Sequence, residues 1–199
     1  MEPEETFRLK KNKSGPCRYL DPLATGLLIV CTGKFTKTIP ELQGMVKEYT
    51  GTFYLGATTP SYDLETEING IFPVSHITEE LLQQTIQQFT GEIDQKPPVF
   101  SAIKKDGKRL YEHARKGEEV EIAARKTTIY EFELTRIALP EVDFRVVCSK
   151  GTYIRSLAYD YGRALQSGAH LTALRRTKIG NYSVEGAISP ETFENEVTL

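Results

Sequence analysis

The chain has 199 residues, of which 39% are hydrophobic, and this is enough apolar material for the core of one large domain or two small ones. It contains no apolar run of membrane-spanning length and no secretory signal at its N-terminus, so we expect a soluble, cytoplasmic protein that binds no membrane. Three cysteines without C-x-x-C spacing and three histidines without ligand spacing indicate a reducing compartment and argue against a metal enzyme.

The formal net charge is −2, but many of the basic side chains are concentrated in three clusters. Basic patches on an acidic protein suit a surface that meets phosphates, whereas any one cluster can also be an ordinary solvated face. The clusters are therefore candidate phosphate contacts. Their members are Arg8, Lys10, Lys11, Lys13 and Arg18; Lys104, Lys105, Lys108, Arg109, Arg115 and Lys116; and Arg175, Arg176 and Lys178.

The first 18 residues are polar and lack periodicity, so we expect residues 1–18 to form an irregular or poorly ordered N-terminal segment. Asp21 and Pro22 then form a typical helix start, with Asp as the N-cap and Gly26 as the stop of a single turn. The apolar run 27–31 predicts a buried strand. No repeat, linker or low-complexity tract follows, so we treat 19–199 as one domain.

The middle of the chain alternates strand and helix signals. Residues 47–56, rich in Thr and aromatic residues, predict a strand, and residues 60–73 carry the Pro, Asp, Asn and Gly typical of a loop. Thr78 begins a helix whose apolar residues share one face and which Gly91 ends. The segments expected next are an extended entry at 97–103, a tight turn at 105–108, a helix at 109–116 and strands at 119–124, 127–137 and 144–149.

A second strong helix begins at Thr152 and ends at Gly168, with apolar residues at the i, i+3, i+4, i+7 spacing. Strand and turn signals follow over 170–184, and Ser189 begins a last short helix. Strands in runs with few interspersed helices predict an α+β fold, with a mainly antiparallel mixed sheet and flanking helices, rather than a βαβ relay.

Five segments of the chain carry distinctive residue combinations. One reads Leu-Asp-Pro-Leu-Ala-Thr-Gly around Asp21, and another reads Ser-Lys-Gly-Thr-Tyr-Ile-Arg up to Arg155. In their order along the chain, the five resemble the motifs of the tRNA pseudouridine-55 synthases, the TruB family. The resemblance implies a pseudouridine synthase-like catalytic domain and a cofactor-free isomerase. The segments lie at 19–26, 47–63, 97–117, 149–157 and 168–176.

The resemblance assigns catalytic roles to three residues. Asp21 matches the catalytic aspartate, with a helix N-cap as its alternative interpretation. Arg155 matches the arginine that keeps this carboxylate ionised and oriented, with an exposed helix charge as its alternative. Tyr49 matches the tyrosine that stacks against the target base, with a core aromatic as its alternative. We accordingly predict that Asp21 and Arg155 lie within salt-bridge distance in one cleft.

The resemblance also assigns substrate-binding residues. Tyr153 and Leu174 match residues that line the active-site pocket, although plain core packing explains Leu174 nearly as well. A set of basic residues is expected to contact RNA, where phosphate contacts offset the cost of extruding a base. The implied partner is the T-arm stem-loop of tRNA, bound by a monomer without metal or cofactor. The basic residues are Lys104, Arg109, Arg115, Lys150 and Arg175.

Several alternatives stay open from the sequence. Isomerising uridine breaks an N-glycosidic bond and rejoins the base through carbon, and a carboxylate can act there as a nucleophile or as a stabilising anion. Pro16 stands where the family has a histidine, so a non-catalytic tRNA-binding or folding module is the alternative function. A guide-RNA-dependent relative is a third. A glycosidase is disfavoured, because no second acid motif accompanies Asp21.

Overall fold

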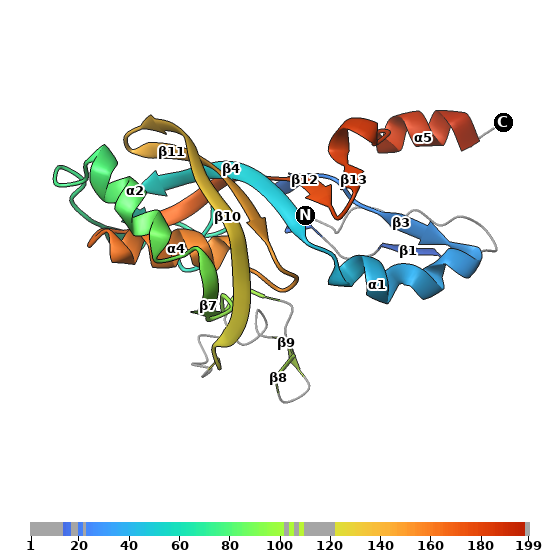
Figure 1. The fold of residues 1–199 in the computed structure, drawn as a ribbon, viewed down its shortest axis with the longest axis horizontal. Coiled ribbons are helices and arrows are strands. Elements are labelled where there is room, and N and C mark those ends of the chain that lie inside the picture. The colour runs from blue at the N-terminus through green and yellow to red at the C-terminus, as the bar shows by residue number, and fades with distance from the viewer. Residues whose placement is uncertain are drawn as a thin grey trace.

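The computed structural model describes residues 14–16, 20–21, 23–101, 104–105, 108–109 and 122–197. Its centre is a seven-stranded sheet with the strand order β13-β12-β4-β11-β10-β7, in which only β2 is parallel to its partner, β12 (Figure 1). The predicted α+β class with a mainly antiparallel sheet is confirmed. The strands are β2 (Ala24–Gly26), β4 (Lys47–Leu55), β7 (Gly91–Gln95), β10 (Arg125–Ala138), β11 (Glu141–Cys148), β12 (Ala169–Ile179) and β13 (Tyr182–Ser183).

Helices and short strand pairs surround this sheet. The predicted helices at Thr78 and Thr152 are confirmed as α2 and α4, and the predicted last helix as α5. The helices are η1 (Gly33–Thr38), α1 (Ile39–Gly44), α2 (Glu79–Gln87), α4 (Ile154–Ala164), η2 (Val184–Gly186) and α5 (Pro190–Val197). The strand pairs are β1 (Ser14–Pro16) with β3 (Val30–Thr32), β5 (Ala57–Thr58) with β6 (Gly70–Ile71), and β8 (Lys104–Lys105) with β9 (Lys108–Arg109).

The main core lies between one face of the sheet and the helices α2 and α4. Phe53 of β4 stacks on Phe144 of β11, with their ring centroids 4.1 Å apart. The apolar stripe predicted for α4 faces this layer, and its Leu157 and Tyr161 are fully buried. The hydroxyl of Tyr161 donates a hydrogen bond of 2.9 Å to the carbonyl oxygen of Leu82 in α2, and burial raises the pKa of this phenol. The two helices are thereby fixed against each other and against the sheet (Figure 1).

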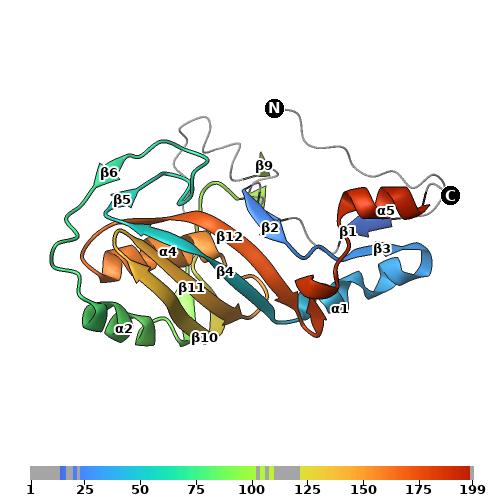
Figure 2. The same cartoon turned by 90° about the horizontal axis from the view of Figure 1, so that it is seen from above.

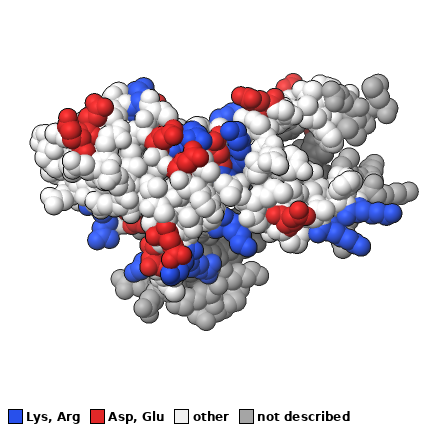
Figure 3. Space-filling view, viewed as in Figure 1, with Lys and Arg blue, Asp and Glu red and all other residues white. Residues whose placement is uncertain are grey.

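The opposite face of the sheet carries paired charges. Residues alternate between the faces along β4, so Glu48 lies on the side away from Phe53. The Glu48 carboxylate accepts hydrogen bonds from Arg145, at 3.0 and 2.9 Å, and from Thr177, at 2.8 Å. Burial alone would raise the pKa of Glu48, but these hydrogen bonds hold it below its ordinary value. In the view of Figure 3, Lys and Arg side chains mostly lie next to Asp and Glu.

The structure corrects the expectation for the segment after Asp21. Instead of a capped helical turn, Ala24–Gly26 form β2, which pairs with residues 174–176 of β12. Gly26 has a φ of +101°, and a Cβ there would lie 2.2 Å from the carbonyl oxygen of Arg176. Glycine is required at this position by both the backbone angle and the close approach. Pairing with a distant strand therefore overrides the local Asp-Pro helix signal.

Further expectations differ from the structure or lie outside the described residues. The strand expected over 27–31 is the shorter β3, and its partner β1 lies in the segment expected to be irregular; residues 1–13 and 17–19 lie outside the described residues. Residues 122–124 form no strand, and residues 119–121 are not described. The helix expected over 109–116 also lies outside the described residues, apart from Arg109 in β9.

Candidate active site

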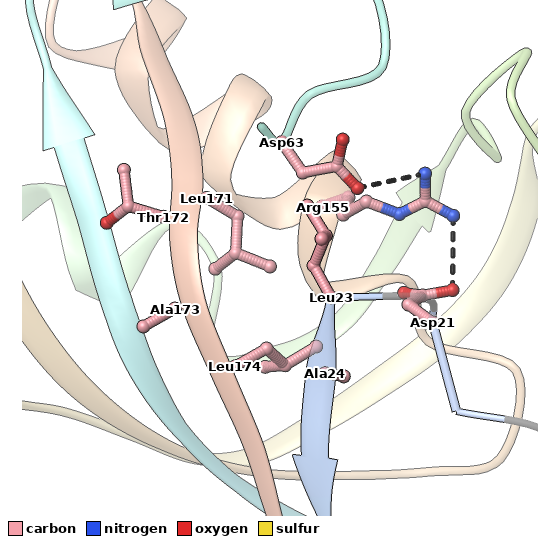
Figure 4. Close-up of a pocket in the computed structure, with 9 residues that line it drawn as sticks. All are labelled: Asp21, Leu23, Ala24, Asp63, Arg155, Leu171, Thr172, Ala173 and Leu174. Carbon is pink, nitrogen blue, oxygen red and sulfur yellow. Dashed lines mark hydrogen bonds and ion pairs between the residues drawn. The ribbon is translucent and has the colours of Figure 1, made fainter. Parts of the chain in front are cut away.

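Segments that are far apart in the sequence meet beside β12. They are the residues around Asp21, the loop containing Asp63, the first turn of α4 with Arg155, and β12 itself. Figure 4 shows their side chains around one small pocket, where leucines lie next to the charged groups. The lining residues are Asp21, Leu23, Ala24, Asp63, Arg155, Leu171, Thr172, Ala173 and Leu174.

Arg155 links two carboxylates at this pocket. Its Nη2 lies 3.1 Å from Oδ1 of Asp21, and its Nη1 lies 3.3 Å from Oδ2 of Asp63. The side chains of Arg155 and Asp63 are only 4% and 6% exposed, whereas that of Asp21 is 37% exposed. The predicted Asp21–Arg155 contact is confirmed. The buried ion pair of Asp63 and Arg155 thus holds the accessible carboxylate of Asp21 in place.

Asp21 is held in place through the backbone of β2. Its carbonyl oxygen accepts a hydrogen bond of 2.9 Å from the amide of Ala24, which closes the turn into the strand. Beyond Gly26, the amide of Leu27 donates to the carbonyl oxygen of Arg176, and the Arg176 side chain donates back to the Leu27 carbonyl, both at 2.8 Å. The Asp21 turn is therefore tied to β12 on its C-terminal side.

Asp63 is aimed at Arg155 by a tightly bonded turn. Tyr62, just before it, has a φ of +64°, and its carbonyl oxygen accepts a hydrogen bond of 2.9 Å from the amide of Leu171 in β12. The hydroxyl of Thr59 donates to the Asp63 carbonyl oxygen at 2.6 Å, and the amide of Glu65 donates to Asp63 Oδ1 at 2.9 Å. This carboxylate is therefore fixed before any substrate arrives.

The start of α4 is clamped by the end of β7. The side-chain amide of Gln95 donates to the carbonyl oxygen of Tyr153 at 3.0 Å and accepts from the amide of the same residue at 2.8 Å. The hydroxyl of Ser156 donates to the carbonyl oxygen of Lys96 at 2.7 Å. These bonds fix the helical turn from which Arg155 projects.

The other predicted site residues are placed as follows. Leu174 lines the pocket and is also part of the main core, so both of its interpretations hold. Tyr49 is half-buried against the main core and is not among the lining residues. Tyr153 is the half-buried N-cap of α4. The predicted RNA contacts Lys150 and Arg175 are exposed.

The remaining predicted RNA contacts are less fully placed. The backbones of Lys104 and Arg109 belong to the paired strands β8 and β9, but their side chains are not described. The centre of the turn expected at 105–108 lies outside the described residues. Arg115 lies outside the described residues.

The basic cluster at the end of β12 is not one surface. Arg176 is buried at 3% exposure, whereas Lys178 lies 3.4 Å from Glu48 on the charged face of the sheet. A register shift in β12 between Arg176 and Lys178 places them on opposite faces of the sheet, because Arg176 pairs with Tyr49 and Lys178 with the adjacent Glu48. Arg175 is exposed and pairs in register with Thr50, on the same face of β4 as Glu48. The expectation of a third basic patch is corrected accordingly.

Asp63 is the functional residue that the sequence did not identify. It stands in the segment 47–63 that carries the resemblance, but no role was assigned to it, because only the fold brings it to Arg155. Within the described ranges, no group of three or more His, Cys, Asp or Glu side chains could hold a metal ion. An accessible carboxylate beside a guanidinium, with leucines next to it, suits attack on or stabilisation of an uncharged ring substrate.

None of the helices in the described part of the chain is both long and apolar enough to cross a membrane.

Two protein-family models together match residues 6–199. Residues 6–154 match the N-terminal domain of the TruB family pseudouridylate synthases, and residues 155–199 match the C-terminal domain of tRNA pseudouridylate synthase B. The boundary between them falls next to Arg155, so the Asp21–Arg155 pair joins the two matched parts. Strands from both parts also pair within the central sheet.

Proteins named tRNA pseudouridine synthase B are similar over almost the entire chain. That of Flavobacterium johnsoniae is 72% identical over 188 residues, which are 94% of this chain and 82% of that protein. That of Bacteroides fragilis is 57% identical over 187 residues, which are 94% of this chain and 80% of that protein. A solved Cbf5-Nop10-Gar1 complex has a TM-score of 0.67 at 28% identity, covering 94% of this chain and 48% of that one. The chain belongs to the TruB family of pseudouridylate synthases.

Proposed function

We propose that this chain is a stand-alone tRNA pseudouridine synthase that isomerises a uridine of the T-arm stem-loop, uridine-55, to pseudouridine. The observation that carries the proposal is the ion pair between Asp21 and Arg155, two residues 134 positions apart, at the mouth of a leucine-lined pocket. Family membership supplies the reaction class, and the high identity to proteins named tRNA pseudouridine synthase B supports tRNA as the substrate.

The reaction needs one ionised carboxylate and no external reactant. The bond between N1 of uracil and C1′ of the ribose breaks, the base turns, and a new bond joins C5 to C1′. C5 loses its hydrogen and N1 gains one, so the product is an isomer of the substrate. Asp21 acts as a nucleophile or as the anion beside the departing base, and its ion pair with Arg155 orients it for either role.

A uridine within a folded loop must leave its stack to reach Asp21, which costs a few kcal/mol. Leu174 and Leu171, which line the pocket, offer apolar contact to the extruded base. On the family resemblance, we propose that Tyr49 and Tyr153 also contact this base. RNA contacts elsewhere offset the cost of extrusion and set the register of the substrate. For these contacts we propose Lys104, Arg109, Arg115, Lys150 and Arg175.

The competing functions are less well supported. A non-catalytic binding module has no need of an accessible carboxylate fixed by a buried arginine, and this chain has that arrangement. A guide-RNA-dependent enzyme is disfavoured, because identity is 28% to the Cbf5-Nop10-Gar1 complex and 72% to a protein named tRNA pseudouridine synthase B. Asp21, Asp63 and Arg155 come from one chain, so we propose that the monomer is the active form.

The decisive experiment replaces Asp21 by Asn and measures tritium release from tRNA labelled at C5 of uridine, together with RNA affinity by filter binding. Asn keeps the size of the side chain but has no negative charge. Turnover should fall below detection, while affinity stays within about tenfold, or roughly 1.4 kcal/mol, because phosphate contacts supply most of the binding. Asp94→Asn, an exposed carboxylate of β7, is the matched control and should retain full activity. Full activity of Asp21→Asn would remove this carboxylate from the mechanism.

A further inference from the structure

A second hollow is lined by residues of α4 and of the segment that contains β5 and β6. Figure 2 shows that β5 and β6 lie on the same side of β12 as β2. The volume of the hollow is about 390 Å³, within the range of sites that hold a small organic group. Its walls are mainly polar, with an aromatic pair and one guanidinium among them. The principal lining residues are Thr58, Tyr62, Asn69, Tyr159, Arg163 and Ser167.

The aromatic pair is the main feature of this hollow. The rings of Tyr62 and Tyr159 stack with their centroids 4.2 Å apart and their planes inclined by 17°. The guanidinium carbon of Arg163 lies 5.9 Å from the centre of the Tyr159 ring. Burial raises the pKa of Tyr62 to about 12, so its phenol keeps its proton at neutral pH. Stacked rings with an adjacent arginine are the kind of surface on which proteins bind single-stranded nucleic acid.

The turn that carries Tyr62 serves both hollows. A bulky residue with a φ of +64° is held in a conformation that it rarely adopts, and such strain persists only where the surroundings impose it. Here the amide of Leu171 fixes the Tyr62 carbonyl, so the Tyr62 ring points to Tyr159 while the next residue, Asp63, reaches Arg155. One turn therefore carries both a ring of the aromatic pair and the Asp63 carboxylate that contacts Arg155.

Both hollows are lined by residues of α4. Arg155, Tyr159 and Arg163 recur every four residues, so they share one side of the helix. At 1.5 Å per residue, Tyr159 lies about 6 Å and Arg163 about 12 Å from Arg155 along the axis. These distances correspond to roughly two to four stacked nucleotides at 3.4 Å each. A strand whose uridine occupies the Asp21 pocket can therefore reach this surface.

The charge of Arg163 is available to a ligand. Its side chain is exposed, and among the described residues no carboxylate lies within 4 Å of it. Asp160 attracts it electrostatically from farther away without forming an ion pair. The side-chain carbonyl oxygen of Asn69 accepts a hydrogen bond of 2.9 Å from the Thr58 hydroxyl, and this bond does not use the NH₂ group of Asn69.

We propose that this hollow binds one nucleotide of the substrate RNA close to the target uridine, with its base against the Tyr62–Tyr159 pair and its phosphate at Arg163. The inference rests on the proposed function for the identity of the ligand as RNA. Asn69 and Thr58 provide polar contacts for the edge of the base, and the stacked pair holds it without reading its sequence. The subsite fixes the strand beside the reacting nucleotide while that nucleotide is extruded.

The test combines two protein variants with a stem-loop RNA. Tyr159→Leu removes a ring but keeps apolar volume in a helix, and Arg163→Gln removes the charge from an exposed position. Tyr159→Leu should weaken RNA binding about tenfold, and Arg163→Gln should weaken it several-fold and lower the salt slope of log Kd by about 0.7. Arg136→Gln, a cation on the opposite face of the sheet, is the matched control and should change neither quantity.

Abasic substitutions, placed singly in the loop of the RNA, identify the bound nucleotide. At one position, removing the base should weaken binding to the parent chain about tenfold. The same abasic RNA should bind the Tyr159→Leu variant no more weakly than it binds the parent. The proposal would be overturned if, at every position, the affinity lost with the abasic RNA added to the affinity lost with Tyr159→Leu. Parent-like RNA binding by both protein variants would overturn it as well.

Single-turnover tritium release at saturating RNA separates this subsite from the chemistry. The rate with Tyr159→Leu should stay within about threefold of the parent, because the subsite supplies binding rather than chemistry. A slow rate with unchanged affinity would show that the aromatic pair acts only by holding Asp63, and would overturn the proposal. If the parent chain binds RNA but releases no tritium, the proposed function fails, while the binding measurements still decide on the subsite.

Discussion

The buried carboxylate of Asp63 offers the sharpest test of how the active site is organised. Its Oδ2 lies 3.3 Å from Nη1 of Arg155, and both side chains are almost inaccessible to solvent. Two unit charges at this separation attract by about 5 kcal/mol at an effective dielectric constant near 20, before the cost of desolvating them. Breaking a buried ion pair typically lowers the free energy of unfolding by about 3–5 kcal/mol. Because Arg155 still pairs with Asp21, we expect Asp63→Asn to lower it by about 2–3 kcal/mol.

For a chain of this length, the loss of stability expected for Asp63→Asn corresponds to a fall in Tm of roughly 5–10 °C. Asn still accepts the hydrogen bond from the Glu65 amide, so the loop should keep its course. Arg155 loses one of its two anchors, and a displacement of the reacting groups by about 1 Å lowers a rate by about 100-fold. Single-turnover tritium release at saturating RNA should therefore fall by that factor, with affinity within about threefold of the parent.

The matched control is Asp143→Asn. Asp143 also pairs with an arginine, Arg136, at 2.6 Å, but this pair is more exposed and lies on the charged face of the sheet. Its removal should cost about 0–1 kcal/mol and leave the rate unchanged. A parent-like rate for Asp63→Asn at saturating RNA would refute the inference that Asp63 positions Arg155. Equal loss of rate in both variants would refute it as well.

Two further predictions concern stability and RNA binding. Glu48→Gln should lower the free energy of unfolding by about 2 kcal/mol near pH 7. Because the folded-state pKa of Glu48 is below its ordinary value of 4.5, this difference should shrink as the pH falls below about 4.5; urea titrations that give the same difference near pH 3 would contradict the assignment. Replacing three cations together by Gln should weaken tRNA binding and flatten the slope of log K against log salt by about 2–3, whereas an unchanged slope would mean that they do not touch RNA. The three are Lys104, Arg109 and Arg115.

Several features of the fold could be predicted because the information is local. The apolar spacing in α2 and α4 follows the helical period, Thr78 caps α2 through its side chain, and the strand β4 follows its aromatic and Thr-rich pattern. The sequence also indicated the antiparallel class, since strand signals occur in runs. The Asp21–Arg155 pair was predicted from two motifs read together through the family resemblance, because neither motif alone distinguishes a catalytic group from a cap or a surface charge.

The tertiary structure decided what depends on contacts between distant segments. Residues 24–26 form a strand only because β12 lies beside them, and the same pairing requires glycine at position 26. Arg176 and Lys178 are two positions apart in β12, where regular alternation would place them on one face. A register shift between them instead pairs Arg176 with Tyr49 and Lys178 with Glu48, on opposite faces of the sheet. Asp63 becomes part of the site only through the strained turn at Tyr62, which β12 fixes by a single backbone hydrogen bond. Residue spacing determines local periodicity, whereas strand register and the packing of loops on the sheet depend on non-local hydrogen bonds and burial, which no local pattern encodes.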